Sequence, residues 1–493
     1  MKAIVAIDIG TTHCKAGLFY EDGSVIKIAS RIMVSYKMPD GWSYYDPGQV
    51  ISMVSETLEE ITQDYSGAIS AVGIASMAET GLLVNRADGN LRSHFIPWFE
   101  TVTQPMADLI QEKSDPLDYY LKYGLKVSFK SSLAKILWLK REQNYSFEGA
   151  VWLSAADYVA YWLTDLFATD YSLACRTLVF KVNQKVWDEE WLQEWELPRT
   201  LFPPAFQAGQ PVGYVKQSAF GLKKGTPVSI CGHDHVCAAL AMGAIRPGVV
   251  FDSMGTAETL IGALDERPLT KEDYENGLQY GAHVASGLGY WMGGVSTSGG
   301  SIEWLRNLLP PPSPSYADLE NLLTSINQEP TGILYFPYLL GSGSPHTNSK
   351  VRGALIGLSL NHRSEDILKA ILEGTSYEVE FIRQAGERMS GKEIPVLIAA
   401  GGGTRYRAWS LIKANVTGCR IDVSAEPEAT LLGAALAAGI GVGIYQNAQE
   451  VHQALAPREV ESFYPDPRSH QLYQDLYQRG YLMFQKSLRQ YNG

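Results

Sequence analysis

Two stretches of this sequence, half the chain apart, carry the same short pattern. Residues 4–12 form an apolar, β-branched run that ends in Asp-Ile-Gly-Thr-Thr, and residues 249–257 form a second run that ends in Ser-Met-Gly-Thr-Ala. Another short apolar run follows each Gly-Thr pair, which predicts one hairpin at Gly10 and one at Gly255. The two glycines are 245 positions apart in a chain of 493 residues, so the pattern favours two copies of one domain. Chance repetition of a common strand-turn-strand pattern is the alternative.

The segments around these hairpins alternate between helical and strand patterns. Asp46 precedes apolar residues at helical spacing up to Ile61, and an apolar run follows at 71–75, which predicts a helix and then a buried strand. Residues 396–400 predict another buried strand before a glycine-rich turn and a helix, and residues 467–491 predict a packed C-terminal helix. This alternation predicts a mainly parallel sheet with helices on its faces.

The composition is that of a globular protein with two or three domains, since 45% of the residues are hydrophobic and 19% are charged. The formal net charge of −12 argues against general binding to nucleic acid or to an anionic membrane. The N-terminal apolar run soon meets Asp8 and is typical of a strand, not of a signal peptide, and no window reaches the ~20 apolar residues of a membrane span. We therefore expect a cytoplasmic protein with a small-molecule partner.

The five cysteines are scattered and do not resemble a disulfide framework. Cys231 and Cys237 flank His233-Asp234-His235, which raises the alternative of a zinc site. The usual C-x-x-C and H-x(3–5)-H spacings are absent here, and alternate residues of a strand point to opposite faces. Free buried thiols are therefore the expectation.

The first hairpin has the parts of a phosphate-binding turn. Gly10 lets backbone N–H groups approach an anion, the hydroxyl groups of Thr11 and Thr12 can donate to it, and Lys15 supplies positive charge. Asp8, at the end of the strand, can hold a water molecule of Mg²⁺. The alternative is a plain hairpin turn with a solvated lysine.

The second hairpin offers a matching set of donors at Gly255 and Thr256. Two such turns facing each other across a cleft would clamp the phosphates of a nucleotide. Gly401 and Gly402 lie between a predicted strand and a predicted helix, where bare backbone can accommodate an adenosine group near a helix N-terminus. Most glycine runs are plain loops, which is the alternative here.

Longer motifs resemble the FGGY family of carbohydrate kinases. Residues 353–358, and residues 366–373 after a spacer of seven, fit the second signature of that family at every constrained position. The first signature is matched less fully, by Ser132 and within residues 135–142. Its opening position is Lys130, where the family has a small or aromatic residue. Similar segments cover essentially the whole chain.

The resemblance implies an α/β fold of two actin-like, ribonuclease-H-like domains, each with a mixed sheet and flanking helices, around a central cleft for ATP and sugar. We expect the N-terminal domain at residues 1–243, with the sugar site, the first phosphate hairpin and the catalytic aspartate. The C-terminal domain, with the second phosphate hairpin and the adenosine site, is expected at residues 244–493. The resemblance also implies ATP and Mg²⁺ as cofactors, a small sugar, ketose or polyol as substrate, and assembly as a homodimer or homotetramer.

The family has its catalytic base in a Gly-x-Asp segment just before the second phosphate hairpin, a position that Gly232-His233-Asp234 occupies here. The resemblance therefore implies that Asp234 takes the proton from the acceptor hydroxyl and helps to position the metal. His235 stands where relatives have an Asn or Gln that contacts the substrate. From the residues alone, Asp234 can equally be the N-cap of a helix predicted for residues 236–242, and both roles can coexist.

Residues 76–81 resemble the sugar-contacting turn of the family. Glycerol kinases carry Arg-Glu there and xylulokinases Met-His, whereas this chain has Met77, Ala78 and Glu79. The Glu79 carboxylate can accept two hydroxyl hydrogen bonds, and a solvated surface glutamate is the alternative. Trp98 falls where relatives have a tryptophan near the substrate, and a core residue is its alternative.

Two other functions fit parts of the pattern. An actin-like or chaperone-like ATPase would use the same phosphate hairpins, because fold does not determine function. A catalytically inactive kinase relative with a binding role would explain the altered sugar turn. The family signatures favour the active kinase.

Overall fold

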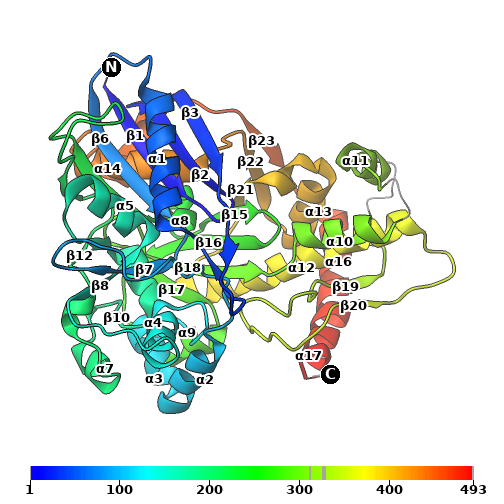
Figure 1. Cartoon of the computed structure of the whole chain (residues 1–493). Helices are drawn as coiled ribbons and strands as arrows, with labels where there is room; N and C mark the ends of the chain where they lie inside the picture. Colours follow the sequence, from blue (N-terminus) through cyan, green and yellow to red (C-terminus); the bar gives the residue numbers. More distant parts are fainter. Residues whose placement is uncertain (1, 310–312, 325–328, 491–493) are drawn as a thin grey trace.

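The computed structural model describes residues 2–309, 313–324 and 329–490, and these ranges contain two large β-sheets, of six and seven strands (Figure 1). The strands of the first sheet are β1 (Ala3–Ile9), β2 (His13–Tyr20), β3 (Val25–Ile32), β6 (Ile69–Ser76), β13 (Pro211–Tyr214) and β14 (Pro227–His233). The strands of the second are β15 (Val249–Met254), β16 (Glu258–Asp265), β17 (Gln279–Ala282), β18 (Leu288–Val295), β21 (Val396–Ala400), β22 (Arg420–Ser424) and β23 (Val460–Phe463). Their orders are β13-β14-β6-β1-β2-β3 and β17-β18-β16-β15-β21-β22-β23.

Both sheets combine antiparallel hairpins with a parallel centre. β1 pairs antiparallel with β2 and parallel with β6, and β15 pairs antiparallel with β16 and parallel with β21. Among the described strands of these sheets, parallel pairing is confined to β14-β6-β1 and β15-β21-β22. The prediction of a mainly parallel sheet is therefore wrong, because neighbours joined by a short turn must pair antiparallel. The predicted mixed sheets and both hairpins are confirmed.

Helices flank the sheets. Those of the N-terminal half are α1 (Pro47–Thr62), α2 (Gln104–Lys113), α3 (Pro116–Tyr123), α4 (Ser132–Arg141), α5 (Ala155–Thr164), α6 (Tyr171–Ala174), α7 (Glu189–Glu194) and α8 (Asp234–Ala241). Those of the C-terminal half are α9 (Lys271–Asn276), α10 (Gly299–Leu308), α11 (Tyr316–Thr324), α12 (Ser364–Ser390), α13 (Arg407–Thr417), α14 (Ala429–Gly441), α15 (Ala448–Ala454), α16 (Pro467–Leu476) and α17 (Leu482–Gln490). The remaining strands are β4 (Tyr36–Lys37), β5 (Ser43–Tyr44), β7 (Gly81–Asn85), β8 (Ala150–Ser154), β9 (Thr169–Asp170), β10 (Phe180–Lys181), β11 (Val186–Trp187), β12 (Ala205–Phe206), β19 (Leu334–Phe336) and β20 (Ala354–Ile356).

Several helices begin or end where the sequence predicts. The Asp46 side chain caps α1 by accepting a hydrogen bond from Gln49 N at 2.9 Å. A helix follows the 396–400 strand, and α16 and α17 form the predicted C-terminal helical segment up to Gln490. In the described part of the chain, no helix has both the length and the apolar character needed to cross a membrane.

The alternation of side chains along β1 divides the first half into two layers. Val5 and Ile7 pack with α1 and α5 on one face of the sheet, whereas Ile4 and Ala6 pack with α8 and α14 on the other. The core around α8 and α14 also contains Phe251 and Ile261 of the second sheet. These two helices therefore lie between the two sheets.

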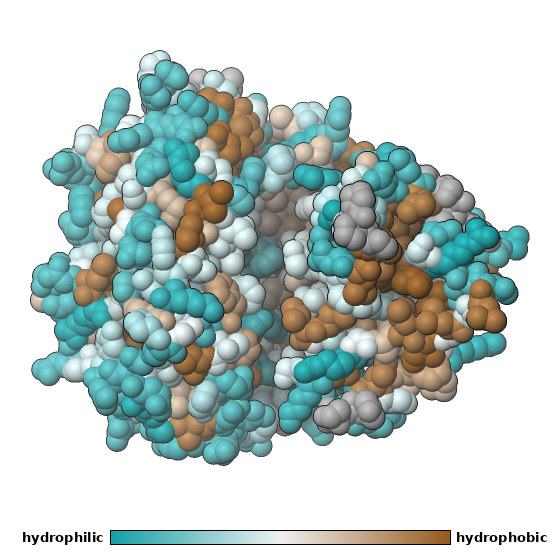
Figure 2. Space-filling view, turned by 45° about the vertical axis from the view of Figure 1, so that its right-hand side comes forward, coloured by the Kyte–Doolittle hydropathy of each residue, from teal (hydrophilic) through white to brown (hydrophobic). Residues whose placement is uncertain are grey.

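Helix α14 belongs to the C-terminal half of the sequence but packs on β1 and β6 of the first sheet (Figure 1). Its close approach to α8 requires a glycine, because a Cβ atom at Gly433 would lie 1.9 Å from the carbonyl oxygen of Cys237. The two halves are thus joined by tightly packed helices, and α8 begins with Asp234. Figure 2 shows a groove on the surface between the two lobes.

Candidate active site

Both predicted phosphate turns begin with a glycine whose N–H is bonded across the turn, although the first turn is one residue longer than the second. Gly10 N donates to the carbonyl oxygen of His13 at 2.9 Å, and Gly255 N donates to that of Ala257 at 3.0 Å. A Cβ atom at either glycine would lie 3.1 Å from the carbonyl oxygen across the turn. The hydroxyl-bearing residues at the tips, Thr12 and Thr256, are both exposed. Each turn therefore has a threonine that is accessible to solvent.

Two of the residues predicted to bind the sugar, Trp98 and Met77, lie next to the first turn. The indole Nε1 of Trp98 donates to the Thr11 hydroxyl at 2.9 Å, and that hydroxyl lies 3.8 Å from the sulfur of Met77. The Lys15 ammonium donates to both carboxylate oxygens of Glu428, at 2.7 and 2.8 Å. Lys15 is thus held by a carboxylate from the C-terminal half, and Thr11 joins the phosphate turn to Trp98 and Met77.

Helix α10 supports the second turn through its backbone. Gly299 N and Gly300 N donate to the carbonyl oxygens of Gly255 and Thr256, at 3.1 and 3.0 Å. A Cβ atom at Gly299 would lie 2.6 Å from the Gly255 oxygen, so the helix can reach the turn only with a glycine there. The second turn is consequently fixed by main-chain contacts from a helix, whereas the first receives a main-chain contact from Met33, whose N–H donates to the carbonyl oxygen of Thr12 at 2.9 Å.

The glycine run after β21 lies against the end of β15. Gly401 has a φ of 111°, and a Cβ atom there would lie 2.6 Å from the carbonyl oxygen of Met254. Gly402 is exposed and has no neighbour within 4 Å of the position of a Cβ atom. A short 3₁₀ turn, Gly402–Arg405, precedes α13. These glycines form an open, bare stretch of backbone next to the second phosphate turn.

Asp8 and Asp234 come from the carboxyl ends of two parallel strands, β1 and β14, on either side of β6. Burial and the negative charge of Asp234 raise the pKa of Asp8 well above its ordinary value. Asp8 Oδ1 is buried and accepts no hydrogen bond from the residues that the structure describes. Two neighbouring carboxylates therefore lie where the central strands of the first sheet end, the usual position of a ligand site in such sheets.

Asp234 is the first residue of α8, and His233 holds the N-cap position without a side-chain capping bond. Asp234 Oδ1 accepts the His235 N–H at 2.7 Å and lies 3.1 Å from His233 Nε2. Burial raises the pKa of Asp234, but the charge of His235 and the hydrogen bond from His233 outweigh it, so the pKa lies below 3.8. The lowered pKa favours an ionised Asp234 carboxylate at neutral pH. The alternative interpretation, that Asp234 is the N-cap of this helix, is wrong, because His233 holds that position.

Glu79 forms a buried ion pair with Arg176, a residue that the sequence did not single out. Arg176 Nε and Nη2 lie 3.0 and 2.5 Å from Glu79 Oε1, and Arg176 Nη1 lies 2.6 Å from Gln279 Oε1. Only 12% of the Glu79 side chain is exposed, so the alternative of a solvated surface glutamate is wrong. Burial raises the pKa of Glu79, but the charges of Arg176, Lys130, His233 and Lys135 together outweigh this effect, so the pKa is lowered.

The backbone of Glu79 has a φ of 62°, in the left-handed region that non-glycine residues rarely adopt. The charges of both Arg176 and Glu79 act on the pKa of His235, which burial lowers. The Glu79–Arg176 pair and the Asp234–His235 pair therefore belong to one site. A sequence signal for Arg176 existed: Ala78 leaves Glu79 without an adjacent arginine, and a buried carboxylate needs a cation.

Lys130, which departs from the first family signature, also lies at the sugar end of the site. Its ammonium lies 4.9 Å from the centre of the Trp98 ring. Its carbonyl oxygen accepts a hydrogen bond from the ammonium of Lys135, which is fully buried. Burial lowers the pKa of Lys130, and the charge of Glu79 opposes this. The sugar end of the site is thus richer in cations than the sequence predicted.

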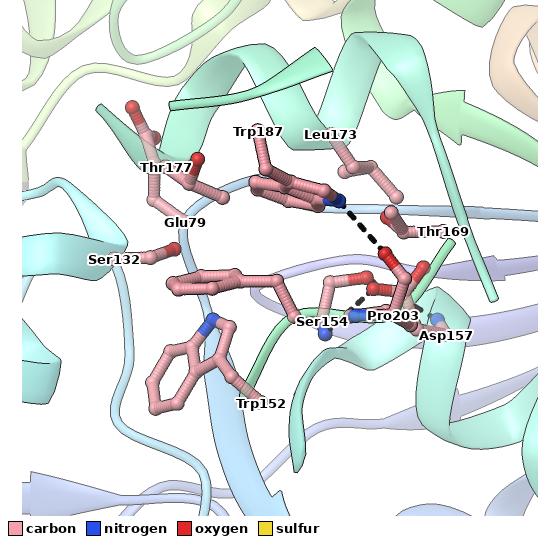
Figure 3. Close-up of a pocket in the computed structure, with 11 residues that line it drawn as sticks. Glu79, Ser132, Trp152, Ser154, Asp157, Thr169, Leu173, Thr177, Trp187 and Pro203 are labelled. Atoms are coloured by element: carbon pink, nitrogen blue, oxygen red, sulfur yellow. Dashed lines mark hydrogen bonds between the residues drawn. The ribbon is translucent and has the colours of Figure 1, made fainter. Parts of the chain in front are cut away.

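A small pocket lies behind Glu79 within the N-terminal half (Figure 3). Trp187 and Trp152 form part of its wall, and the Trp187 indole donates to the carbonyl oxygen of Pro203 at 2.9 Å. Asp157 lines it too, with Oδ2 accepting the Ser154 N–H at 2.9 Å. The phosphate-turn residues do not line it, so this pocket is separate from the nucleotide end of the site.

The five cysteines are buried free thiols, as predicted. In the described ranges no group of three or more His, Cys, Asp or Glu side chains is arranged to hold a metal ion. A cation bound by Asp8 and Asp234 would therefore need further oxygen ligands from substrate or water.

Comparison with known proteins gives matches over the whole chain. The relatives include a xylulose kinase of Bacillus subtilis (strain 168), 27% identical over 97% of this chain and 95% of the relative. A glycerol kinase of Lactococcus lactis subsp. lactis (strain IL1403) is 27% identical over 93% of each. The crystal structure of a gluconate kinase from Lactobacillus acidophilus superposes with a TM-score of 0.92 over 100% of this chain and 99% of that one; its 20% identity shows a shared fold.

Two family models match successive parts of the sequence. The N-terminal domain of the FGGY family of carbohydrate kinases matches residues 3–241, and the C-terminal domain of the same family matches residues 251–442. Together they span most of the chain, including both hairpin turns and Asp234. The chain belongs to the FGGY family of carbohydrate kinases.

Proposed function

We propose that this protein transfers a phosphoryl group from ATP to a hydroxyl of a small sugar, ketose or polyol, with Asp234 as the general base. Membership of a carbohydrate kinase family supports the transfer and does not favour the actin-like or chaperone-like ATPase. The observation that carries the choice of base is the place of Asp234 at the carboxyl ends of the parallel strands, beside the Glu79–Arg176 pair, with its carboxylate oriented by His233 and by the His235 backbone.

An alcohol is a poor nucleophile, so its proton must leave as the new bond to phosphorus forms. Asp234 can accept this proton because its lowered pKa keeps it ionised at neutral pH. The hydrogen bonds from His233 and from the His235 backbone fix the orientation of the carboxylate. The inactive-relative alternative would leave this buried, oriented charge without a use.

The two hairpin turns would hold the phosphates from opposite sides. In this proposal Gly10, Thr11, Thr12 and Lys15 act from the first turn, and Gly255 and Thr256 from the second. The exposed hydroxyl groups of Thr12 and Thr256 suit phosphate oxygens. The Lys15–Glu428 pair would have to loosen if Lys15 is to contact a phosphate. Gly401 and Gly402 would line the adenosine pocket, since nothing occupies the space above Gly402.

Asp8 and Asp234 fit a Mg²⁺ ion. Asp8 Oδ1 is buried without a hydrogen bond from the described residues, and Asp234 raises its pKa, so a divalent cation would relieve the repulsion between the two carboxylates. Bound there, Mg²⁺ would neutralise phosphate charge and align the phosphoryl group. The backbone of Asp8 is held in place because β1 pairs with both β2 and β6.

Glu79, Met77, Trp98 and His235 would contact the sugar. Glu79 keeps acceptor capacity beyond its contacts with Arg176, and Trp98 offers a ring face next to Thr11. The relatives act on xylulose, glycerol and gluconate by name, so the acceptor belongs to this range of small polyhydroxy compounds. We place the N-terminal domain at residues 1–243 and the C-terminal domain at residues 244–493. Closure of these two lobes on the substrate would exclude water from the site.

The test is ADP release from Mg²⁺-ATP with a panel of ketoses, aldoses, polyols and sugar acids. Strong release with one compound and little without any supports the proposal. Equal release in every well would favour a bare ATPase, and silence throughout would favour an inactive relative. With the best acceptor, replacement of Asp234 by Asn is expected to remove most of the release.

A further inference from the structure

The sugar end of the site contains three cations, and two of them have clear partners. Arg176 is paired with Glu79 and Gln279. Lys135 is fully buried, and its ammonium donates to the carbonyl oxygen of Lys130. Burial lowers the pKa of Lys135, and the nearby carboxylates of Glu79 and Glu100 partly oppose this effect. These two cations are therefore matched by groups of the protein itself.

The third cation, Lys130, is different. Its ammonium lies over the Trp98 ring and makes no hydrogen bond or ion pair with residues in the ranges 2–309, 313–324 and 329–490. A cation–π contact compensates only part of the hydration that an ammonium group loses on burial. Burial lowers the pKa of Lys130. The charge of Glu79 opposes this effect, but Glu79 is already bonded to Arg176 and also acts on Lys135, so this one carboxylate serves three cations. Lys130 thus has capacity for an anionic partner.

The position of Lys130 ties it to the acceptor. Trp98, under its ammonium, donates through its indole to Thr11 of the phosphate turn. Trp98 also donates through its backbone N–H to Thr80 Oγ1 at 3.0 Å, next to Glu79. The ammonium therefore lies over the residue that joins the phosphate turn to the Glu79 segment, where an acceptor must be bound.

We propose that the acceptor of this kinase is a sugar acid, a polyhydroxy compound with a carboxylate, and that Lys130 binds this carboxylate. This inference rests on the proposed function of the same site. Closure of the lobes around a neutral sugar would leave the ammonium with only hydroxyl partners in a site without water. A carboxylate would satisfy both its charge and its donors, in a charge-assisted hydrogen bond.

The experiment compares matched pairs of acceptors that differ only in charge: aldonates of four, five and six carbons and the alditols with the same hydroxyl configuration. The wild-type protein is expected to show a kcat/KM at least ~10-fold higher for the best aldonate than for its alditol, the effect of one hydrogen bond to a charged group. The best ketose and aldose are included as neutral competitors.

The Lys130→Met variant keeps the length of the side chain and removes its charge. We expect it to lose the preference for the aldonate through a KM for the aldonate at least ~10-fold higher, whereas the KM for ATP and the KM for the alditol should change by much less. Lys130→Arg should restore part of the preference. The matched control is Lys126→Met, because the Lys126 ammonium also lies over an aromatic ring, 5.1 Å from the centre of Tyr274, outside this site.

The outcomes separate the two proposals. Faster turnover of a neutral sugar by the wild type, or an unchanged aldonate preference in Lys130→Met, overturns the assignment of the acceptor and leaves the kinase function intact. A rise in the KM for ATP alone would assign Lys130 to the nucleotide and equally overturn it. No ADP release with any compound overturns both. Calorimetric titration of the aldonate without ATP gives a readout independent of turnover, and there too Lys130→Met must lose binding.

Discussion

The hairpin turn at Gly10 and the hairpin turn at Gly255 share a glycine whose N–H is bonded across the turn, but their lengths and surroundings differ. Two residues before the turn glycine, the first strand has Asp8 and the second has Ser253. The carboxylate of the second strand is one residue earlier, at Asp252, and so points to the opposite face. The same structural unit therefore supplies a functional carboxylate in one half and a structural one in the other.

Asp252 belongs to a fully buried ionic cluster. The Lys413 ammonium bonds to Asp252 Oδ2 and Glu258 Oε1, and all three side chains are inaccessible to solvent. Burial and the charge of Glu258 raise the pKa of Asp252, and Lys413 opposes them. In the first half, Lys15 and Glu428 also pair, but both side chains are partly exposed, at 25% and 20%. The cluster in the second half is thus expected to stabilise the fold, and the pair in the first half to remain available for function.

The largest effect on stability should come from Lys413. Lys413→Met leaves two buried carboxylates without a counter-charge and should lower the free energy of unfolding by about 3–5 kcal/mol. Lys15→Met breaks a partly exposed pair and should cost about 1 kcal/mol or less. Denaturant unfolding followed by tryptophan fluorescence measures both. Equal losses in the two variants would remove the distinction between the two halves.

The two equivalent strand positions should differ in their effect on turnover. Asp8→Asn should lower kcat by about 10- to 100-fold and raise the Mg²⁺ concentration needed for half-maximal rate, because it weakens the proposed hold on the cation. Ser253→Ala should leave the rate close to wild type. Steady-state ADP release over a series of Mg²⁺ concentrations measures both, and similar losses would show that the two positions have the same role.

The pH dependence of stability offers a smaller and independent effect. The raised pKa of Asp8 means that the folded protein binds this proton more tightly than the unfolded chain does. The stability from this group is therefore present below the ordinary pKa of 3.8 and is lost as the pH rises through the folded value. Asp8→Asn removes this loss, so without Mg²⁺ and nucleotide the variant should melt at a higher temperature than wild type near neutral pH. The difference should shrink towards ~pH 4, and a difference that stays constant with pH would contradict the account.

Local patterns in the sequence predicted what depends on local chemistry. The two Gly-Thr hairpins and helix α1 with its Asp46 cap follow from turn residues and helical spacing within a few positions. The proportion of parallel strands was predicted wrongly, because pairing depends on which strands become neighbours. A family resemblance was needed to choose Asp234 as a base, since its tripeptide fits several roles.

Contacts between distant parts of the chain could not be predicted in this way. Arg176 and Glu79 are 97 positions apart, and Lys15 and Glu428 are 413 apart, so no local periodicity links them. The departure at Lys130 was visible in the sequence, but its place over Trp98 follows only from the fold. These long-range contacts fix the charge of the first phosphate turn and of the sugar end of the site.

The most direct test of the account is the turnover of Asp234→Asn at saturating ATP and acceptor. If Asp234 is the base, kcat falls by at least ~10²-fold, the lower end for loss of a general base, while the melting temperature stays near wild type. Asp115→Asn is the matched control, because Asp115 also lies at a helix start, where it caps α3 by accepting the Asp118 N–H at 2.8 Å. Near wild-type turnover in Asp234→Asn, or an equal fall in Asp115→Asn, would contradict the assignment of Asp234 as the base.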